Sequence, residues 1–152
     1  MHFNLCDLAA DIAQNGAESG ANLLVLEIRE TVGHAGGQAE FRFIVRDNGK
    51  GMSAAALEKA MDPFVTDGVK HPGRKVGLGI PFLIQTAEQS GGGWRISAAK
   101  EDCEPALRFG GAHVTGNSAD AGIGTTVEAW FDLANVDTPP VGDIPGLFRT
   151  AL

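Results

Sequence analysis

The sequence predicts an α+β fold, in which helices cover one face of a mostly antiparallel, mixed β-sheet. Three observations support this: helical spacing near the N-terminus, several runs of alternating apolar residues, and glycine- and proline-rich segments between them. At 152 residues the chain has the length of one domain. The order helix, two strands, helix, loop, helix and two strands favours a two-layer sandwich.

The first helix is predicted over residues 3 to 19, and two strands follow it. The helix shows the spacing Leu5, Leu8, Ile12, and Asn15-Gly16 supplies an end signal. On a helical wheel Asn15 falls beside Leu8 in the apolar arc, so we expect a buried amide that needs a partner. Alternating apolar residues predict the strands, namely Leu24, Leu26 and Ile28 over 22 to 30, then Phe41, Phe43 and Val45.

The second half continues with short elements and ends in a tail. Ser53 can cap a helix over 54 to 61, and a helix over 79 to 90 tolerates Pro81 in its first turn. Strands are predicted over 94 to 99 and 124 to 133, and the segment Leu107 to Val114 can add a hairpin. We expect one domain over 1 to 133 and an irregular proline-containing tail over 134 to 152, which packs on the domain or contacts a partner.

The overall charge excludes several kinds of partner. A net charge of −7 argues against general binding to nucleic acid or to an anionic membrane surface. No apolar run approaches the roughly 20 residues of a spanning helix. Cys6 and Cys103 make no disulfide framework, so we expect a reducing, cytoplasmic setting.

Two glycine-containing motifs indicate a nucleotide pocket. Asp47-Asn48-Gly49-Lys50-Gly51 follows an alternating apolar run, and Gly77-Leu78-Gly79 opens a helix. An acid can accept a hydrogen bond from an exocyclic amine, and glycines let the backbone approach a ring or a phosphate. Asp11 and Asn15 lie four residues apart on the first helix, which places a potential base and a potential metal ligand on one face.

Each motif alone also has a structural explanation, since Asp-Asn-Gly is common in turns and Asn-Gly at helix ends. Competing phosphate motifs fail: Gly68 to Gly73 lacks the Lys-Ser/Thr of a P-loop, and Gly77-x-Gly79 has Phe82 where a dinucleotide fold needs glycine. The histidines and cysteines lack zinc-site spacing. The joint occurrence of the motifs in one order is what favours nucleotide binding.

That order, acid-x3-Asn, Asp-x-Gly-x-Gly, Gly-x-Gly and Gly-Thr at 124 and 125, resembles the Bergerat-fold (GHKL) ATPase superfamily. Its members include DNA gyrase B, MutL, the large heat-shock chaperone, histidine kinases and anti-sigma-factor kinases. The resemblance covers about residues 3 to 133, although the stretch 101 to 121 is longer than in kinase domains. The chain looks most like small, stand-alone, bacterial histidine-kinase-like ATPase-domain proteins, which are cytosolic.

The resemblance implies ATP and Mg²⁺ as ligands and a role for each matching residue. Asn15 would bind magnesium, and Asp11 would activate the attacking water, although Asp is one methylene shorter than the usual Glu. Asp47 would accept the adenine amino group, and Thr125 would support Asp47. The remaining matches are the pocket floor and wall at Gly49, Gly51 and Met52, the aromatic box at Phe64 and Thr66, phosphate-neutralising Lys70, Arg74 and Lys75 in an ATP lid over 67 to 76, and the second glycine box at Gly77, Leu78 and Gly79.

We therefore expect an Mg-ATP binding domain that hydrolyses ATP slowly or transfers its γ-phosphoryl group to a separate protein. The sequence shows no dimerising helical pair with a phosphoacceptor histidine, so the acceptor is expected on a protein partner, with no nucleic acid or membrane involved. Two alternatives stay open. One is a non-catalytic regulatory module whose surface changes with the bound nucleotide, and the other is a glycine-rich domain without a nucleotide site.

Overall fold

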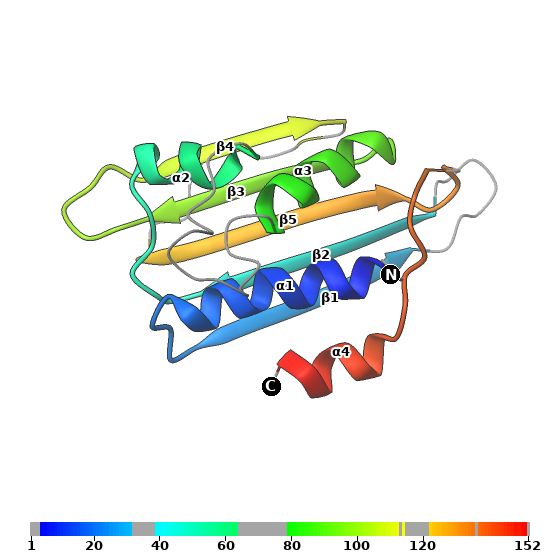
Figure 1. Cartoon of the computed structure of the whole chain (residues 1–152), viewed down its shortest axis with the longest axis horizontal. Coiled ribbons are helices and arrows are strands. Elements are labelled where there is room, and N and C mark those ends of the chain that lie inside the picture. Colours follow the sequence, from blue (N-terminus) through cyan, green and yellow to red (C-terminus); the bar gives the residue numbers. More distant parts are fainter. Residues whose placement is uncertain are drawn as a thin grey trace.

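The computed structural model describes residues 4–31, 39–63, 79–112, 114, 122–135 and 137–151. Four helices and five strands lie in these ranges (Figure 1). None of these helices combines the length and apolar composition needed to span a membrane. In chain order the elements are α1 (Leu5–Glu18), β1 (Leu24–Thr31), β2 (Glu40–Asp47), α2 (Ala54–Met61), α3 (Gly79–Gln89), β3 (Gly93–Ala99), β4 (Ala106–Gly111), β5 (Gly124–Asp132) and α4 (Ile144–Ala151).

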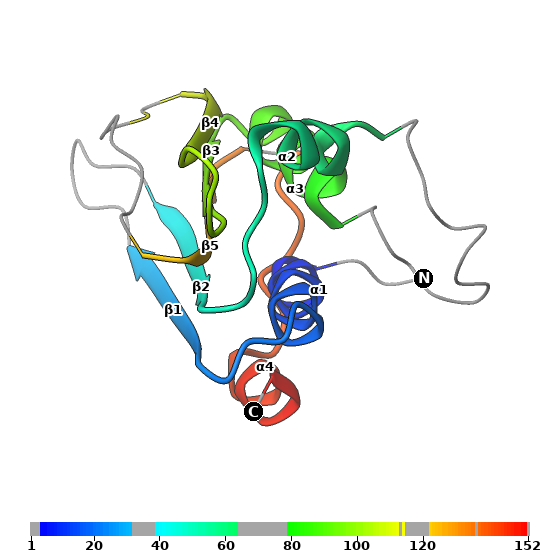
Figure 2. The ribbon, with the colours of Figure 1, turned by 90° about the vertical axis from the view of Figure 1, so that its left-hand side faces the viewer.

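The strands form one five-stranded sheet in the order β1-β2-β5-β3-β4. Every pairing between the described strands is antiparallel. The helices lie on one side of this sheet, as the side view in Figure 2 shows. This confirms the predicted two-layer α+β sandwich. β4 pairs with β3 in an antiparallel hairpin, within the segment where the sequence indicated one.

The core lies between the sheet and the helices, and it is built from alternate residues of the central strands. Phe41 and Phe43 of β2 and Phe131 of β5 are all fully buried. Their ring centroids lie 6.0 to 6.5 Å apart. Burying each such side chain contributes roughly 1.5 to 3 kcal/mol to folding. The alternation that buries them also carries Asp47, the last residue of β2, to the helix side of the sheet.

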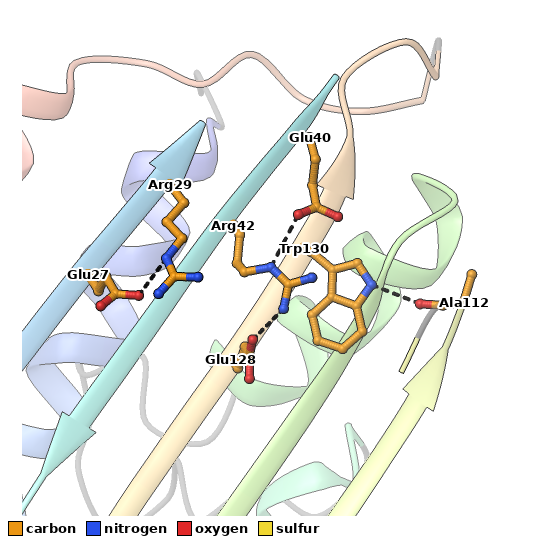
Figure 3. A network of polar contacts seen from close by, with 7 residues as sticks. All are labelled: Glu27, Arg29, Glu40, Arg42, Ala112, Glu128 and Trp130. Carbon is orange, nitrogen blue, oxygen red and sulfur yellow. Dashed lines mark hydrogen bonds and ion pairs between the residues drawn. The ribbon is translucent and has the colours of Figure 1, made fainter. Parts of the chain in front are cut away.

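On the opposite face of the sheet no helix lies among the described residues, and charged side chains of β1, β2 and β5 interact there (Figure 3). Arg42 donates hydrogen bonds to Glu40 at 3.2 Å and to Glu128, and its guanidinium lies 4.5 Å from the ring centroid of Trp130. The Trp130 indole donates to the carbonyl of Ala112 at 2.8 Å, which satisfies its polar atom. Burial opposes the charge on Arg42, but the hydrogen bonds to Glu40 and Glu128 outweigh burial and raise its pKa.

The C-terminal tail differs from the expectation, because residues 144 to 151 form helix α4 instead of irregular chain. Pro145 lies in the first turn, where its missing N–H removes no helical hydrogen bond. Leu147 is the buried anchor of this helix against α1. The carbonyls of Pro140 and Val141 also accept hydrogen bonds from the first backbone N–H groups of α1, each at 2.9 Å, so the tail caps that helix.

Candidate functional site

A cavity of about 300 Å³ opens between α1 and the ends of β2 and β5. In Figure 1 this end of the sheet is where the α1–β1 turn and the connection from β2 to α2 lie side by side. The walls of the cavity are largely apolar, with polar groups at a few points, as expected for a small-molecule site. The apolar side chains are Ile12, Val45, Met52, Ala60, Ile80 and Val127, and the polar ones are Asn15, Glu18, Ser19, Asp47, Lys50 and Thr125.

Asp47 is held so that one carboxylate oxygen is occupied by the protein. Its Oδ1 accepts a hydrogen bond from the Gly49 N–H at 2.9 Å, and the Ser19 hydroxyl lies 3.4 Å from the same oxygen. That hydroxyl is closer to the Gly16 carbonyl, at 2.7 Å, so its single proton serves the carbonyl first. Oδ2 therefore remains as the oxygen that can accept a hydrogen bond from a ligand.

Two glycines of the same motif allow this geometry in different ways. Gly51 has φ +71°, and a Cβ there would lie 1.9 Å from the carbonyl oxygen of Ala99. A Cβ on Gly49 would lie 1.9 Å from the Ser19 hydroxyl oxygen. Gly51 lines the cavity, whereas Gly49 does not line it but holds the Asp47 carboxylate through its N–H. Larger residues would displace the loop that carries Asp47.

Thr125 stands directly opposite Asp47 in the antiparallel register of β2 and β5. Both residues line the cavity. The preceding Gly124 has φ +129°, and a Cβ on it would lie 2.0 Å from the Asp47 carbonyl oxygen. The Gly-Thr pair therefore has a physical basis: the glycine lets the two strands approach, and the threonine side chain reaches the cavity beside the carboxylate.

The acid-x3-Asn pair is placed partly as expected. Asn15 lines the cavity but is exposed, so the expected burial of its amide was wrong. It lies near the C-terminal end of α1 and faces the open cavity rather than the packed core. Asp11 is also exposed and does not line the cavity. The start of α3 lies against both residues, because a Cβ on Gly79 would be 3.5 Å from Asn15 Nδ2 and 3.9 Å from Asp11 Cβ.

Six of the expected site residues lie outside the described ranges, together with Arg74 and the expected lid over 67 to 76. They are Phe64, Thr66, Lys70, Lys75, Gly77 and Leu78. Their assignments remain expectations. Within the described residues the cavity thus brings together Asn15, Asp47, Gly51, Met52 and Thr125.

Sequence reasoning missed several residues of the site, of which Gly16 and Ser19 are the most informative. Gly16 is buried in α1, and a Cβ on it would lie 2.9 Å from Asp47 Oδ2, so the helix approaches the carboxylate through this glycine. A glycine inside a helix costs about 1 kcal/mol relative to alanine, and that cost was a signal of a close contact. Ser19 had no comparable signal, because its contacts with the Asp47 loop are distant in sequence.

Comparison with known proteins agrees with this geometry. Residues 2–135 match the family model described as Histidine kinase-, DNA gyrase B-, and HSP90-like ATPase. The chain belongs to this family. As a member of the GHKL group it is an ATP-binding domain, which confirms the resemblance seen in the order of the motifs.

A solved relative is the ATPase domain of Aquifex aeolicus MutL complexed with ADP. It shares 13% sequence identity with this GHKL chain, and the superposition has a TM-score of 0.36. The match covers 95% of this chain but only 45% of the MutL chain. The chain thus spans less than half the length of that relative.

Proposed function

We propose that this protein binds Mg-ATP in the cavity between α1 and the sheet, and that it hydrolyses ATP slowly or transfers the γ-phosphoryl group to a separate protein. The observation that carries the proposal is the convergence of Asn15, Asp47 and Thr125 on one cavity from three different elements. In this assignment Asp47 Oδ2 accepts the exocyclic amine of adenine, and Met52 packs against the ring.

The residues present fit a magnesium ion that is bound mainly by the nucleotide. Mg²⁺ commonly keeps several waters and takes only one or two protein ligands beside phosphate oxygens. The exposed amide of Asn15, at the cavity wall, suits such a single ligand. The described residues contain no group of three or more His, Cys, Asp or Glu side chains that would hold a metal ion by themselves. The ion, when bound, would neutralise phosphate charge and orient the terminal phosphate.

Asp11 is the candidate for activating a nucleophile. It lies four residues before Asn15, on the same face of α1, and both residues adjoin the start of α3. A carboxylate there would accept a proton from water or from an acceptor group on the partner. All four histidines, at positions 2, 34, 71 and 113, lie outside the described residues. In this proposal the acceptor group lies on a partner protein.

A variant of Asp11 separates nucleotide binding from turnover. Asp11→Asn keeps the size of the side chain but removes its basicity. We expect magnesium-dependent affinity for a non-hydrolysable ATP analogue within about twofold of wild type, while phosphate release or phosphoryl transfer falls by roughly 100-fold or more. Calorimetry and a phosphate-release assay measure the two quantities. Unchanged turnover in this variant would remove Asp11 from the mechanism.

A second candidate is a non-catalytic module that binds a partner in a nucleotide-dependent manner. The observation favouring it is the short side chain of Asp11, which does not line the cavity. In this case Asp11→Asn would bind the partner as tightly as wild type does, both when the two proteins are compared with ATP and when they are compared with ADP. Measurable turnover by wild type that Asp11→Asn abolishes would exclude this candidate.

A further inference from the structure

The side chain of Asn48 connects two loops of the site. Its Oδ1 accepts hydrogen bonds from the backbone N–H groups of Asn22 and Leu23, both at 3.0 Å. Its Nδ2 donates to Asn22 Oδ1 at 2.6 Å. Asn48 is exposed, so burial does not explain these contacts. An asparagine has about four hydrogen-bonding sites, and most of them are used here.

Backbone hydrogen bonds connect the same two loops. The Asn48 N–H donates to the Leu23 carbonyl and the Lys50 N–H donates to the Ser19 carbonyl, each at 3.3 Å. The first loop, residues 19 to 23, leaves the end of α1 that carries Asn15. The second loop begins at Asp47. Asn48 therefore lies at the junction between the element of the metal ligand and the element of the base acceptor.

The two elements are in close contact beside this junction. A Cβ on Gly16 would lie 2.9 Å from Asp47 Oδ2 and 3.1 Å from Asp47 Cβ, which leaves no spare space between α1 and the carboxylate. A small change in the relative position of the loops would therefore change where Oδ2 points. A bound nucleotide must contact both elements at once, so their relative position matters for ATP more than for a smaller ligand.

We propose that Asn48 is a positioning residue that fixes the carboxylate of Asp47 relative to Asn15. The inference rests on the proposed function. When the two elements are already aligned, ATP binds without the free-energy cost of ordering them. Adenosine contacts the base side alone and gains little from this alignment. Asn48 thus raises the affinity for Mg-ATP more than the affinity for adenosine.

The test measures both ligands by calorimetry on the full chain. Asn48→Ala removes the three side-chain hydrogen bonds, and we expect affinity for a non-hydrolysable Mg-ATP analogue to fall about tenfold while affinity for adenosine falls less than about threefold. Asn48→Asp keeps an acceptor for the two backbone N–H groups and should restore Mg-ATP affinity to within about threefold of wild type. A simple loss of stability would not change the ratio of the two affinities.

Asn135→Ala is the matched control, since Asn135 Oδ1 accepts the Asp137 N–H at 2.8 Å in a turn that does not line the cavity. It should leave the ratio unchanged. If Asn48→Ala does not fold, Asn22→Ala replaces it, because this change removes only the 2.6 Å bond and should shift the ratio about threefold.

The outcomes are distinguishable. Absence of Mg-ATP binding by wild type would overturn the proposed function together with this inference. Wild-type binding with an unchanged ratio in Asn48→Ala, or in Asn22→Ala where that variant replaces it, would overturn the inference alone. Equal damage by Asn48→Asp and Asn48→Ala would also overturn it, because the retained acceptor would then have no effect.

Discussion

Asp47 and Thr125 face each other across β2 and β5, and both line the same cavity. The strand register therefore fixes which hydroxyl lies beside the carboxylate. Residues in register on antiparallel strands have Cβ atoms about 5 Å apart, and the sheet holds that spacing more rigidly than a loop would. In the proposed function this pair forms the base-binding side of the site.

The first prediction concerns the hydroxyl of Thr125. Thr125→Val preserves shape but removes the hydrogen-bonding group, so we expect affinity for an ATP analogue to fall about five- to tenfold, corresponding to about 1 kcal/mol. Thr126→Val is the matched control, because Thr126 is the next residue of β5 and alternates to the opposite face. Calorimetric titration of both variants measures the difference. Equal affinities would show that the Thr125 hydroxyl contributes nothing to binding.

The second prediction compares two glycines with positive φ. Gly51→Ala combines backbone strain with a Cβ 1.9 Å from the Ala99 carbonyl oxygen, whereas Gly20→Ala at φ +85° has no atom within 4 Å. We expect Gly20→Ala to lower the free energy of unfolding by about 1 to 2 kcal/mol and Gly51→Ala to lower it by more. Urea denaturation gives both values. A smaller effect at Gly51 would contradict the packing described for this loop.

The third prediction follows from the thiol of Cys6. Burial raises its pKa from 9.0 to about 11, and Asp143, Asp7 and Glu30 add to the shift. The native protein therefore keeps this proton to higher pH than the unfolded chain does. The stability from the neutral thiol is fully present below about pH 9 and is lost as the pH rises through about 11. Cys6→Ala should lose less stability than wild type between about pH 9 and about pH 11 in urea denaturation. Identical pH dependence would contradict the shift.

A fourth prediction tests the docking of the tail. Leu147 is 4% exposed, and it borders a hollow of about 250 Å³ that Cys6 also lines. Leu147→Ala should lower the free energy that holds α4 against α1 by about 2 kcal/mol or more. It should therefore speed alkylation of Cys6. The exposed Cys103 is the internal reference, and its rate should not change. Mass spectrometry of peptides carrying each cysteine follows both rates. An unchanged Cys6 rate would mean that α4 does not protect it.

The fifth prediction compares two ion pairs on the helix-free face. Glu128→Ala removes a partner of Arg42 where both side chains are about one-fifth exposed, at 19% and 21%. We expect a loss of about 1.5 to 3 kcal/mol and a red-shifted emission from Trp130, measured in a Trp94→Phe background. Glu27→Ala breaks a pair whose side chains are 41% and 66% exposed, and it should cost less than about 1 kcal/mol. Similar losses in the two variants would contradict the role assigned to burial.

The layer structure was predictable because it depends on local periodicity. Alternating Phe41, Phe43 and Val45 lie on the buried face of β2 as expected, and α2 begins after Ser53 and ends at Met61 as predicted. The burial of Asn15 was mispredicted because a helical wheel shows the direction of a side chain but not whether packed core or an open cavity lies in that direction. The helix-side position of Asp47 followed from the same alternation as the phenylalanines.

The tail and the loop contacts were not predictable for a different reason. Prolines at 139, 140 and 145 indicated irregular chain, but the stability of α4 comes from burial of Leu147 against α1, which is a tertiary effect. The hydrogen bonds of Asn48 join residues about 25 positions apart. Such contacts leave no periodic pattern in a single sequence.

The most direct test of the central claim is calorimetric titration of the protein with a non-hydrolysable ATP analogue, with and without magnesium, beside Asp47→Asn. This variant keeps the side-chain volume but replaces part of the acceptor with a donor, which would face the amino group of adenine. The account predicts saturable, magnesium-dependent binding by wild type and at least about tenfold weaker binding by Asp47→Asn. Equal affinity of the two proteins would show that the cavity beside Asp47 and Thr125 does not hold the base.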